Sequence, residues 1–146
     1  MAAGVLEPEQ ALRMVAKRGE LMEKAVPRGG KMAAVLGLSA RQIQKLCREV
    51  SAEVGIIEPA NYNCPGQIVV SGWEKALEEF AARARLDGAK RIVPLATSGP
   101  FHSSLMERIA PQWQEIVEKV RLAPVAVPYV ANVNAEYLSE PATIRA

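Results

Sequence analysis

Two side chains in this sequence are of a type and in a position that suit chemistry, His102 and Arg18. His102 is the only histidine of the chain, so acid–base chemistry near neutral pH that uses an imidazole must use this residue. It follows Ser-Gly-Pro-Phe at a predicted junction between a loop and a helix, and such loop ends often carry catalytic groups. One interpretation is a general base for a hydroxyl or thiol nucleophile. The other is a surface or capping histidine.

Arg18 lies on the first predicted helix, residues 7–26. On a helical wheel with about 100° per residue, this helix has one narrow polar face and a broad apolar arc, and Arg18 falls near the middle of that arc. A buried guanidinium is costly unless it is paired. Arg18 could therefore bind a carboxylate or phosphate through its planar fork, form a buried structural ion pair, or extend to the surface along its alkyl chain.

A nucleophile to accompany His102 is harder to find. The Gly-x-Ser-x-Gly motif of a nucleophile elbow occurs nowhere in the 146 residues. Cys64 sits in a Pro-Gly turn with no base beside it in sequence, and Cys47 lies on an apolar helix face, which is typical of a core residue. The sequence also has no phosphate-binding glycine loop and no metal-ligand spacing, so we expect no metal and no cofactor. Four serines read as caps or turn residues: Ser39, Ser98, Ser103 and Ser104.

The elements predicted to position these residues alternate between strands and helices. Their order is strand, helix, strand, strand, helix, strand, which is that of a ferredoxin-like βαββαβ unit. A helical stretch follows at 102–120, in which Pro111 should cause a kink or mark a second start, and a short strand is predicted near 129–131. The βαββαβ elements span residues 32–38, 39–54, 56–63, 67–71, 73–86 and 91–96.

The helices at both ends lie outside this unit and carry apolar faces, which suggests a piece of something larger. Exposed apolar patches usually find a partner, so we expect self-association through these faces.

The composition excludes few functions. The net charge of +2 gives no general reason to expect nucleic acid or a membrane as partner. No apolar run reaches the roughly 20 residues that span a bilayer, no secretory signal is recognisable, and two cysteines fit a cytoplasmic protein.

Five stretches, in order and with similar spacing, resemble the malonyl-CoA:acyl-carrier-protein transacylase family. They are AAGVLEPEQALRMVAKRGELM, GGKMAAVLGL, ANYNCPGQIVVSG, AKRIVPLATSGPFHSSLM and PYVANVNA. The resemblance implies an α+β fold, in which a ferredoxin-like small subdomain is flanked by helices of an α/β-hydrolase-like acyltransferase domain. It divides the chain into a helix of the large domain (1–30), the small subdomain (31–97) and a return segment to the large domain (98–146).

The resemblance also assigns roles. Arg18 matches the arginine of the family's R-G-x-x-M segment, which holds the malonyl carboxylate, and Met22 closes that segment. His102 matches the catalytic histidine, and Phe101 precedes it as in members that prefer malonyl over methylmalonyl units. The implied reaction is S-malonyl transfer in fatty-acid biosynthesis, with malonyl-CoA as substrate and the phosphopantetheine of an acyl carrier protein as acceptor.

Members of the family carry the nucleophilic serine in a G-H-S-x-G elbow, shortly before the A-A-G-V-L segment with which this chain opens. Catalysis needs nucleophile, base and oxyanion donors together, so we expect the chain to be a truncated fragment that is inactive alone. Two alternatives remain: a non-enzymatic ferredoxin-like binding module and the acyltransferase region of a polyketide synthase. An RNA-binding module should carry aromatic residues on its central strands, and the stretches MAAVLGL and RIVPLA carry none.

Overall fold

The computed structural model describes residues 3–26, 28–131, 134–138, 140 and 143–144. It divides into two compact units, Met1–Leu21 with Ala110–Ala146, and Met22–Ile109. The first helix, α1 (Pro8–Ala25), begins in the first unit and ends in the second. The three-part division at 1–30, 31–97 and 98–146 that the family resemblance implies stays a prediction.

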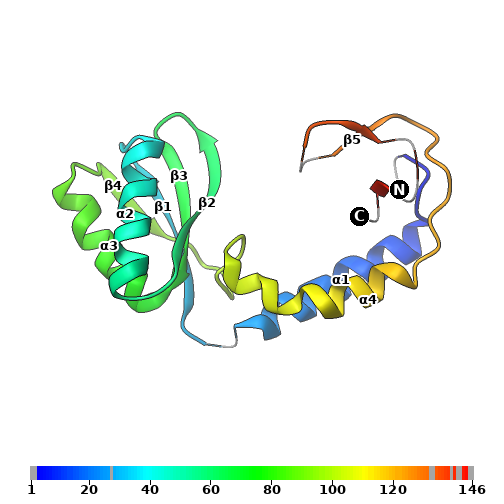
Figure 1. The fold of residues 1–146 in the computed structure, drawn as a ribbon, viewed down its shortest axis with the longest axis horizontal. Helices are drawn as coiled ribbons and strands as arrows, with labels where there is room; N and C mark the ends of the chain where they lie inside the picture. Colours follow the sequence, from blue (N-terminus) through cyan, green and yellow to red (C-terminus); the bar gives the residue numbers. More distant parts are fainter. Residues whose placement is uncertain (1–2, 27, 132–133, 139, 141–142, 145–146) are drawn as a thin grey trace. The chain divides into compact units, whose positions relative to one another are not determined.

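The second unit is built on a four-stranded antiparallel sheet with strand order β2-β3-β1-β4 (Figure 1). The chain order is strand, helix, strand, strand, helix, strand, as predicted, and the fold is mixed α/β. The central position of β1 explains why it is almost wholly apolar, since a strand covered on both faces needs no polar side. The elements are β1 (Gly30–Leu36), α2 (Ala40–Glu53), β2 (Ile57–Cys64), β3 (Gln67–Trp73), α3 (Glu74–Leu86) and β4 (Arg91–Pro94).

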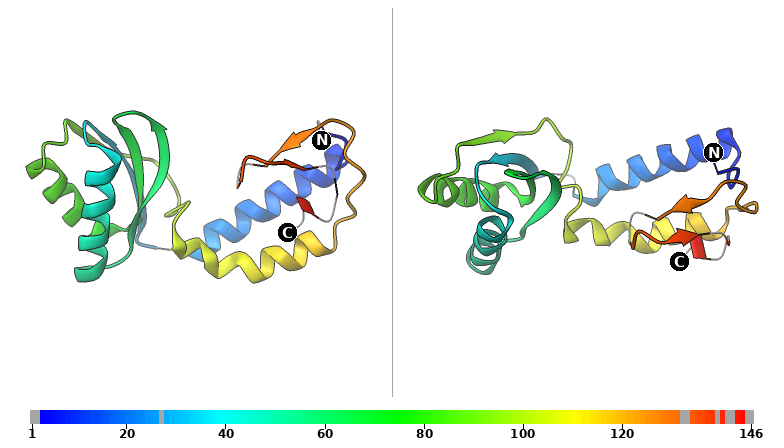
Figure 2. Two further views of the ribbon diagram at one scale, coloured as in Figure 1. Left: turned by 45° about the horizontal axis from the view of Figure 1, so that its top comes forward. Right: turned by 90° about the horizontal axis from the view of Figure 1, so that it is seen from above.

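Helices α2 and α3 cover one face of the sheet, and the two views in Figure 2 agree with Figure 1 on this. The main core lies between the helices and the sheet. Its largest fully buried side chains include Phe80 of α3, Ile43 and Val50 of α2, and Val35 and Val70 of the sheet. Alternation along the strands sends Val35 and Val70 to this face and their neighbours to the other.

The opposite face of the sheet is also apolar and carries a second cluster around Met32, Ala34 and Val69. The segment that follows β4 covers it, because Leu95 and Phe101 pack against that cluster. Pro100 lies directly against the start of β1: a Cβ atom on Gly30 would come within 2.2 Å of its ring. This segment leads to the short 3₁₀ helix η1 (Ser104–Ile109).

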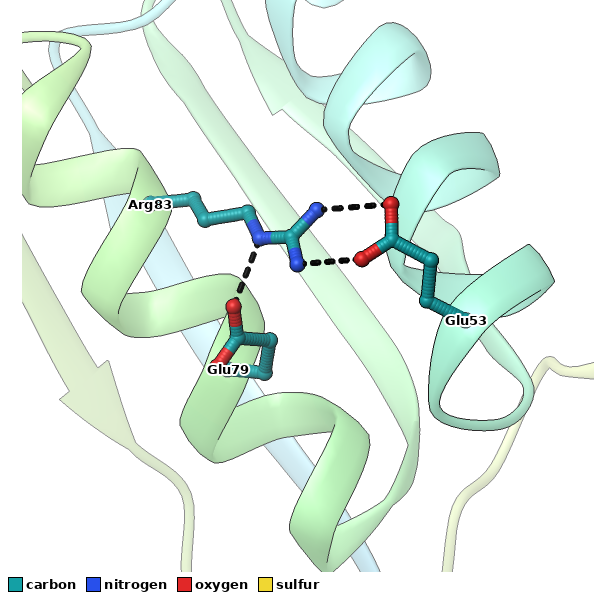
Figure 3. Close-up of polar contacts among 3 residues, drawn as sticks. All are labelled: Glu53, Glu79 and Arg83. Carbon is teal, nitrogen blue, oxygen red and sulfur yellow. Dashed lines mark hydrogen bonds and ion pairs between the residues drawn. The ribbon is translucent and has the colours of Figure 1, made fainter.

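Polar contacts fix the ends of both sheet-covering helices. Ser39 is the N-cap of α2 in a capping box with Gln42, as expected from its place before the helix. At the other end of α2, Glu53 accepts two hydrogen bonds from Arg83 of α3, at 2.6 and 3.3 Å, and Glu79 accepts a third at 2.7 Å (Figure 3). These hydrogen bonds lower the pKa of Glu53 and raise that of Arg83. One guanidinium therefore ties α2 to α3.

The first unit contains most of α1, the helix α4 (Ala110–Glu118) and a two-stranded ribbon of β5 (Tyr129–Val130) and β6 (Tyr137–Leu138) (Figure 2). Residues 123 and 126 donate backbone hydrogen bonds to the carbonyls of Val5 and Ala3, which joins the beginning of the chain to the segment after α4. The predicted strand near 129–131 is confirmed at β5. Residues 132–133 of the fifth family-like stretch and Pro27 of the predicted helix end lie outside the described residues.

The helical stretch predicted at 102–120 is divided in the structure. Phe101 and His102 form a turn, Ser103 is a bend, η1 follows, and α4 starts at Ala110. Pro111 explains the break, because it has no N–H to donate and would interrupt an α-helix running through it, whereas it is tolerated in a first turn. Of the two outcomes expected for Pro111, the second start is confirmed. No helix among the described residues is long and apolar enough to cross a membrane.

Candidate active site

His102 lies between β4 and η1 in a backbone conformation that residues with a Cβ rarely adopt. Its φ angle is 58°, in the left-handed region, and its side chain is exposed. Histidine visits this region more often than most residues, but each such residue is worth inspection. Strained backbones of this kind cost about 1–3 kcal/mol and gather at functional sites. The conformation therefore favours a functional histidine over an incidental surface one.

Three contacts fix the segment around His102. Before it, Pro100 packs on Gly30. Across it, the buried hydroxyl of Ser103 donates a hydrogen bond of 2.6 Å to the Pro100 carbonyl. After it, the backbone N–H of Ser104 donates a hydrogen bond of 2.6 Å to Oε2 of Glu58 on β2. Ser103 thus acts as a turn residue, in line with its sequence interpretation, and the acceptor Glu58 is a residue that the sequence analysis did not single out.

A pocket of about 640 Å³ opens beside His102, between α2, the edge strand β2 and the turn into η1. It offers donors and acceptors of several kinds around one imidazole, which suits a site for a polar ligand. Its lining residues are Gln44, Cys47, Arg48, Ser51, Ile57, Glu58, Pro59, His102, Ser103, Ser104 and Glu107.

Cys47 lines this pocket but is not a reactive thiol. Burial is the main cause that raises its pKa to about 12, and the nearby Glu58 carboxylate adds to the effect. A thiol with so high a pKa carries almost no thiolate at neutral pH, and the thiolate is the nucleophile. The sequence interpretation of Cys47 as a core residue is therefore confirmed. Cys64 is exposed beside the turn of Pro65 and Gly66, and its thiol contacts the side-chain oxygen of Gln67.

Phe101 is half-buried on the second face of the sheet, where it packs with Met32, Ala34 and Val69. Its ring also closes over Gly99, where an added Cβ would lie 3.3 Å from the ring. Phe101 and His102 are consecutive residues of the same anchored segment. Phe101 is thus held by the sheet, whereas the imidazole next to it is exposed at the pocket.

Of the interpretations open for Arg18, the structure excludes a buried ion pair among the described residues: Arg18 is exposed, and so are Leu12 (66% exposed) and Val15 (69%) of the same arc. Helix α1 meets a hydrophobic core only at its end, where Ala25 is its one buried residue. Burial needs a surface to pack against, and a wheel shows only which side chains share a face.

The charges of α1 distinguish Arg18 from its neighbours. Arg13 pairs with Glu9 at 2.7 Å and Lys17 with Glu20 at 2.9 Å. No hydrogen bond or ion pair joins the Arg18 guanidinium to another residue in the described part of the chain. Arg18 belongs to the first unit, whereas half-buried Met22, Phe101 and His102 belong to the second. Among the described residues, no group of three or more His, Cys, Asp or Glu side chains could hold a metal ion.

Comparison with known proteins identifies the family. Residues 1–144 match the family model described as "Acyl transferase domain". The malonyl CoA-acyl carrier protein transacylase of Staphylococcus aureus (strain COL) is 47% identical over 137 residues, which are 93% of this chain and 44% of the relative. That of Bacillus subtilis (strain 168) is 42% identical over 146 residues, 99% of this chain and 46% of the relative.

A solved structure gives the same result. A malonyl-transacylase in complex with its type II PKS acyl-carrier protein superposes with a TM-score of 0.91 at 38% identity, and the match covers 98% of this chain and 46% of that one. The chain thus spans about half the length of the relatives that it matches. The resemblance seen in the sequence is confirmed, and the chain belongs to the acyl transferase domain family.

Proposed function

We propose that this chain supplies the general base and the carboxylate-binding arginine of an S-malonyltransferase that moves a malonyl group from malonyl-CoA to an acyl carrier protein in fatty-acid synthesis. The observation that carries the proposal is His102, held in a left-handed conformation beside a polar pocket, in a chain 47% identical to a malonyl CoA-acyl carrier protein transacylase. Backbone strain lowers the stability of the fold and gathers at functional sites, so its presence at the one imidazole of the chain supports a catalytic role.

The reaction has two steps, with His102 as proton carrier in both. A serine hydroxyl attacks the malonyl thioester carbon, its proton passes to His102, the C–S bond breaks, and coenzyme A leaves with that proton as a thiol. In the second step His102 takes the proton of the carrier's pantetheine thiol, whose sulfur attacks the malonyl ester. The ester C–O bond breaks and the serine regains the proton. The proposal assigns the base to this chain and leaves the serine to residues outside it, since no Gly-x-Ser-x-Gly motif occurs among the 146.

Arg18 is the proposed anchor for the malonyl carboxylate, with Met22 one turn further along the same helix. The guanidinium is exposed and no described residue pairs with it, which leaves its fork free to bind a carboxylate bidentately. The ring of Phe101, held on the sheet beside His102, would crowd a methyl group on the α-carbon of the acyl chain. These assignments favour malonyl over acetyl and methylmalonyl groups.

The fold assignment that belongs to this proposal is a ferredoxin-like small subdomain at residues 31–97, flanked by segments of an α/β-hydrolase-like large domain (1–30 and 98–146). The strand order β2-β3-β1-β4 with two helices on one face supports the ferredoxin-like description. The apolar, exposed face of α1 around Leu12 and Val15 supports a large-domain neighbour for that helix.

A chimaera tests the proposal. Residues 1–144 would replace the matched segment of the Staphylococcus aureus transacylase, and transfer to holo acyl carrier protein would be followed with malonyl-CoA and acetyl-CoA. We expect the chimaera to transfer malonyl groups and Arg18→Ala to lower kcat/KM for malonyl-CoA about 10- to 100-fold, the loss of a charge-assisted pair. Activity with acetyl-CoA should not fall. Equal losses with both substrates would remove Arg18 from carboxylate binding.

A further inference from the structure

Glu58 reaches from the edge strand of the sheet to the segment that carries His102. Ile57 beside it is buried in the cluster under α2 and α3, so alternation along the strand turns Glu58 to the other face of the sheet, opposite the buried Ser71. There the half-buried carboxylate meets the turn into η1. Glu58 and His102 line the same pocket within one compact unit.

The contact is a short one between a charge and a backbone donor. Oε2 of Glu58 accepts the Ser104 N–H at 2.6 Å. Hydrogen bonds to an ionised acceptor are roughly twice as strong as neutral ones. Ser104 is the first residue of η1, and the first N–H groups of a helix have no partner within it. The carboxylate thus satisfies a backbone donor two residues after His102.

The left-handed conformation of His102 needs restraint from both sides. Strained conformations persist only when the surroundings over-determine them. On the near side, Pro100 is fixed by Gly30 and by the Ser103 hydroxyl. On the far side, Ser104 donates its backbone N–H to Glu58 on the edge strand, and Leu105 after it is buried in a small apolar cluster. Without the carboxylate, the far side keeps the packing of Leu105 but loses the hydrogen bond that fixes the Ser104 backbone.

We propose that Glu58 is a positioning residue for His102: its carboxylate holds the Ser104 N–H and thereby fixes the backbone that aims the imidazole at the pocket. The proposal rests on the proposed function, in which His102 is the base. Glu58, a residue of strand β2, makes no contact with the substrate in the proposed reaction. Glu58 acts on the reaction through the conformation of His102.

The test uses the chain itself, in which a single histidine makes the signals of His102 unambiguous. Nuclear magnetic resonance of labelled protein would compare wild type with Glu58→Ala, Glu58→Gln and Glu107→Gln. The readouts are the Cα and Cβ shifts and the N–H to Hα coupling of His102, which report a positive φ, and the hydrogen exchange rate of the Ser104 amide. Glu107→Gln is the matched control, because it removes a carboxylate from the same pocket.

We expect Glu58→Ala to raise the Ser104 exchange rate at least tenfold and to abolish the left-handed signature of His102, while core amides such as Val35 and Val70 keep their protection. Glu58→Gln retains an acceptor oxygen and should restore the signature, with an upfield shift of the Ser104 amide proton because a neutral acceptor binds it less strongly. Glu107→Gln should change neither readout.

The proposal is overturned if His102 keeps its left-handed signature in Glu58→Ala, or if Glu107→Gln disturbs it equally. If Glu58→Ala fails to fold, the Glu58→Gln variant tests the proposal by itself. An unchanged chemical shift of the Ser104 amide proton in that variant would show that the Glu58 carboxylate does not bind this amide. Failure here leaves the base role of His102 intact, because that role is measured by acyl transfer in the chimaera. An inactive chimaera with an intact Glu58 effect would instead reject the proposed function.

Discussion

At the scale of single residues, the left-handed backbone of His102 should lower the stability of the fold at the residue proposed as the base. A left-handed φ angle of 58° brings a Cβ too close to the following carbonyl, which costs about 1–2 kcal/mol and spares only glycine. The anchored turn around His102 supplies the restraint that keeps this conformation. The strain should therefore be measurable as a difference between two substitutions that both remove the imidazole.

We expect His102→Gly to be more stable than His102→Ala by about 1 kcal/mol, because glycine adopts this region without a Cβ penalty. Urea unfolding in a Trp113→Phe background would measure the difference, because the fluorescence then comes from Trp73, which packs against the core of the second unit. An alanine variant as stable as the glycine variant would show that the left-handed conformation is not maintained in solution.

The buried thiol of Cys47 gives a pH dependence with a definite sign. Its pKa rises from 9.0 to about 12 on folding, mainly through burial. Because the folded state keeps a proton that the unfolded state releases, the stabilisation is fully present below pH 9 and is lost as the pH rises towards 12.

The free energy of unfolding should therefore fall more steeply between pH 8.5 and 10.5 in wild type than in Cys47→Ala, since the other groups that titrate there are common to both. In folded protein a thiol reagent should modify exposed Cys64 and leave Cys47 unmodified. Identical pH slopes, or rapid reaction of two thiols in the folded chain, would contradict this account.

The residues of the candidate site differ in how well the sequence alone predicts their positions and contacts. His102 is a candidate from sequence because it is a lone histidine at a loop end, and its role stays a prediction. The cap at Ser39 is predicted and confirmed, because caps have a local signature. The exposure of Arg18 could not be decided from sequence, since a wheel assigns a shared face but not the surface that covers it. Glu58 carries no signal, because its partner Ser104 lies 46 residues away and only the sheet brings them together.

At the scale of elements, local periodicity is enough to predict the sheet and its two helices. The strands with apolar runs and the two helices lie close to their predicted positions, and α2 has both its predicted cap at Ser39 and core residues at helical spacing. The division of the stretch 102–120 is harder to predict, because the turn at His102 depends on contacts of the neighbouring residues with Gly30 and Glu58 in other parts of the chain.

The link between α2 and α3 offers a test at this scale. Arg83 holds Glu53 through two nitrogens and Glu79 through a third, a geometry that a lysine cannot reproduce. Arg83→Lys should lower the melting temperature of the second unit, and the difference from wild type should shrink in 1 M salt because the charges are exposed.

Arg91→Lys on β4 is the matched control, since it exchanges the same residue types at an exposed position without an ion pair to another described residue. If Arg83→Lys and Arg91→Lys melt alike at low salt, the three contacts of Arg83 contribute nothing to the joining of the helices.

At the scale of the whole molecule, the exposed apolar face of α1 predicts self-association. Leu12 and Val15 expose about two thirds of their surface on the same helix, and a second copy of the chain offers the same apolar face in return. We expect sedimentation at micromolar concentration to show dimers or larger species. The double substitution of Leu12 and Val15 by glutamine should shift the population towards monomer.

The control for this prediction is Leu86→Gln, which changes a leucine that is 87% exposed at the end of α3. Its association should equal that of wild type. A monomeric wild-type chain, or an equal effect of Leu86→Gln, would reject the face of α1 as the contact.

Whether His102 is the base of an S-malonyltransferase, as proposed, can be decided by one rate of acyl transfer. In the chimaera with the Staphylococcus aureus transacylase, malonyl transfer to holo acyl carrier protein would be measured with His102 and with alanine in its place. We expect His102→Ala to lower kcat/KM about 10²- to 10⁴-fold, the loss typical of a general base, and the chain of 146 residues alone to transfer nothing. An active chimaera whose transfer rate is unchanged by His102→Ala would contradict it.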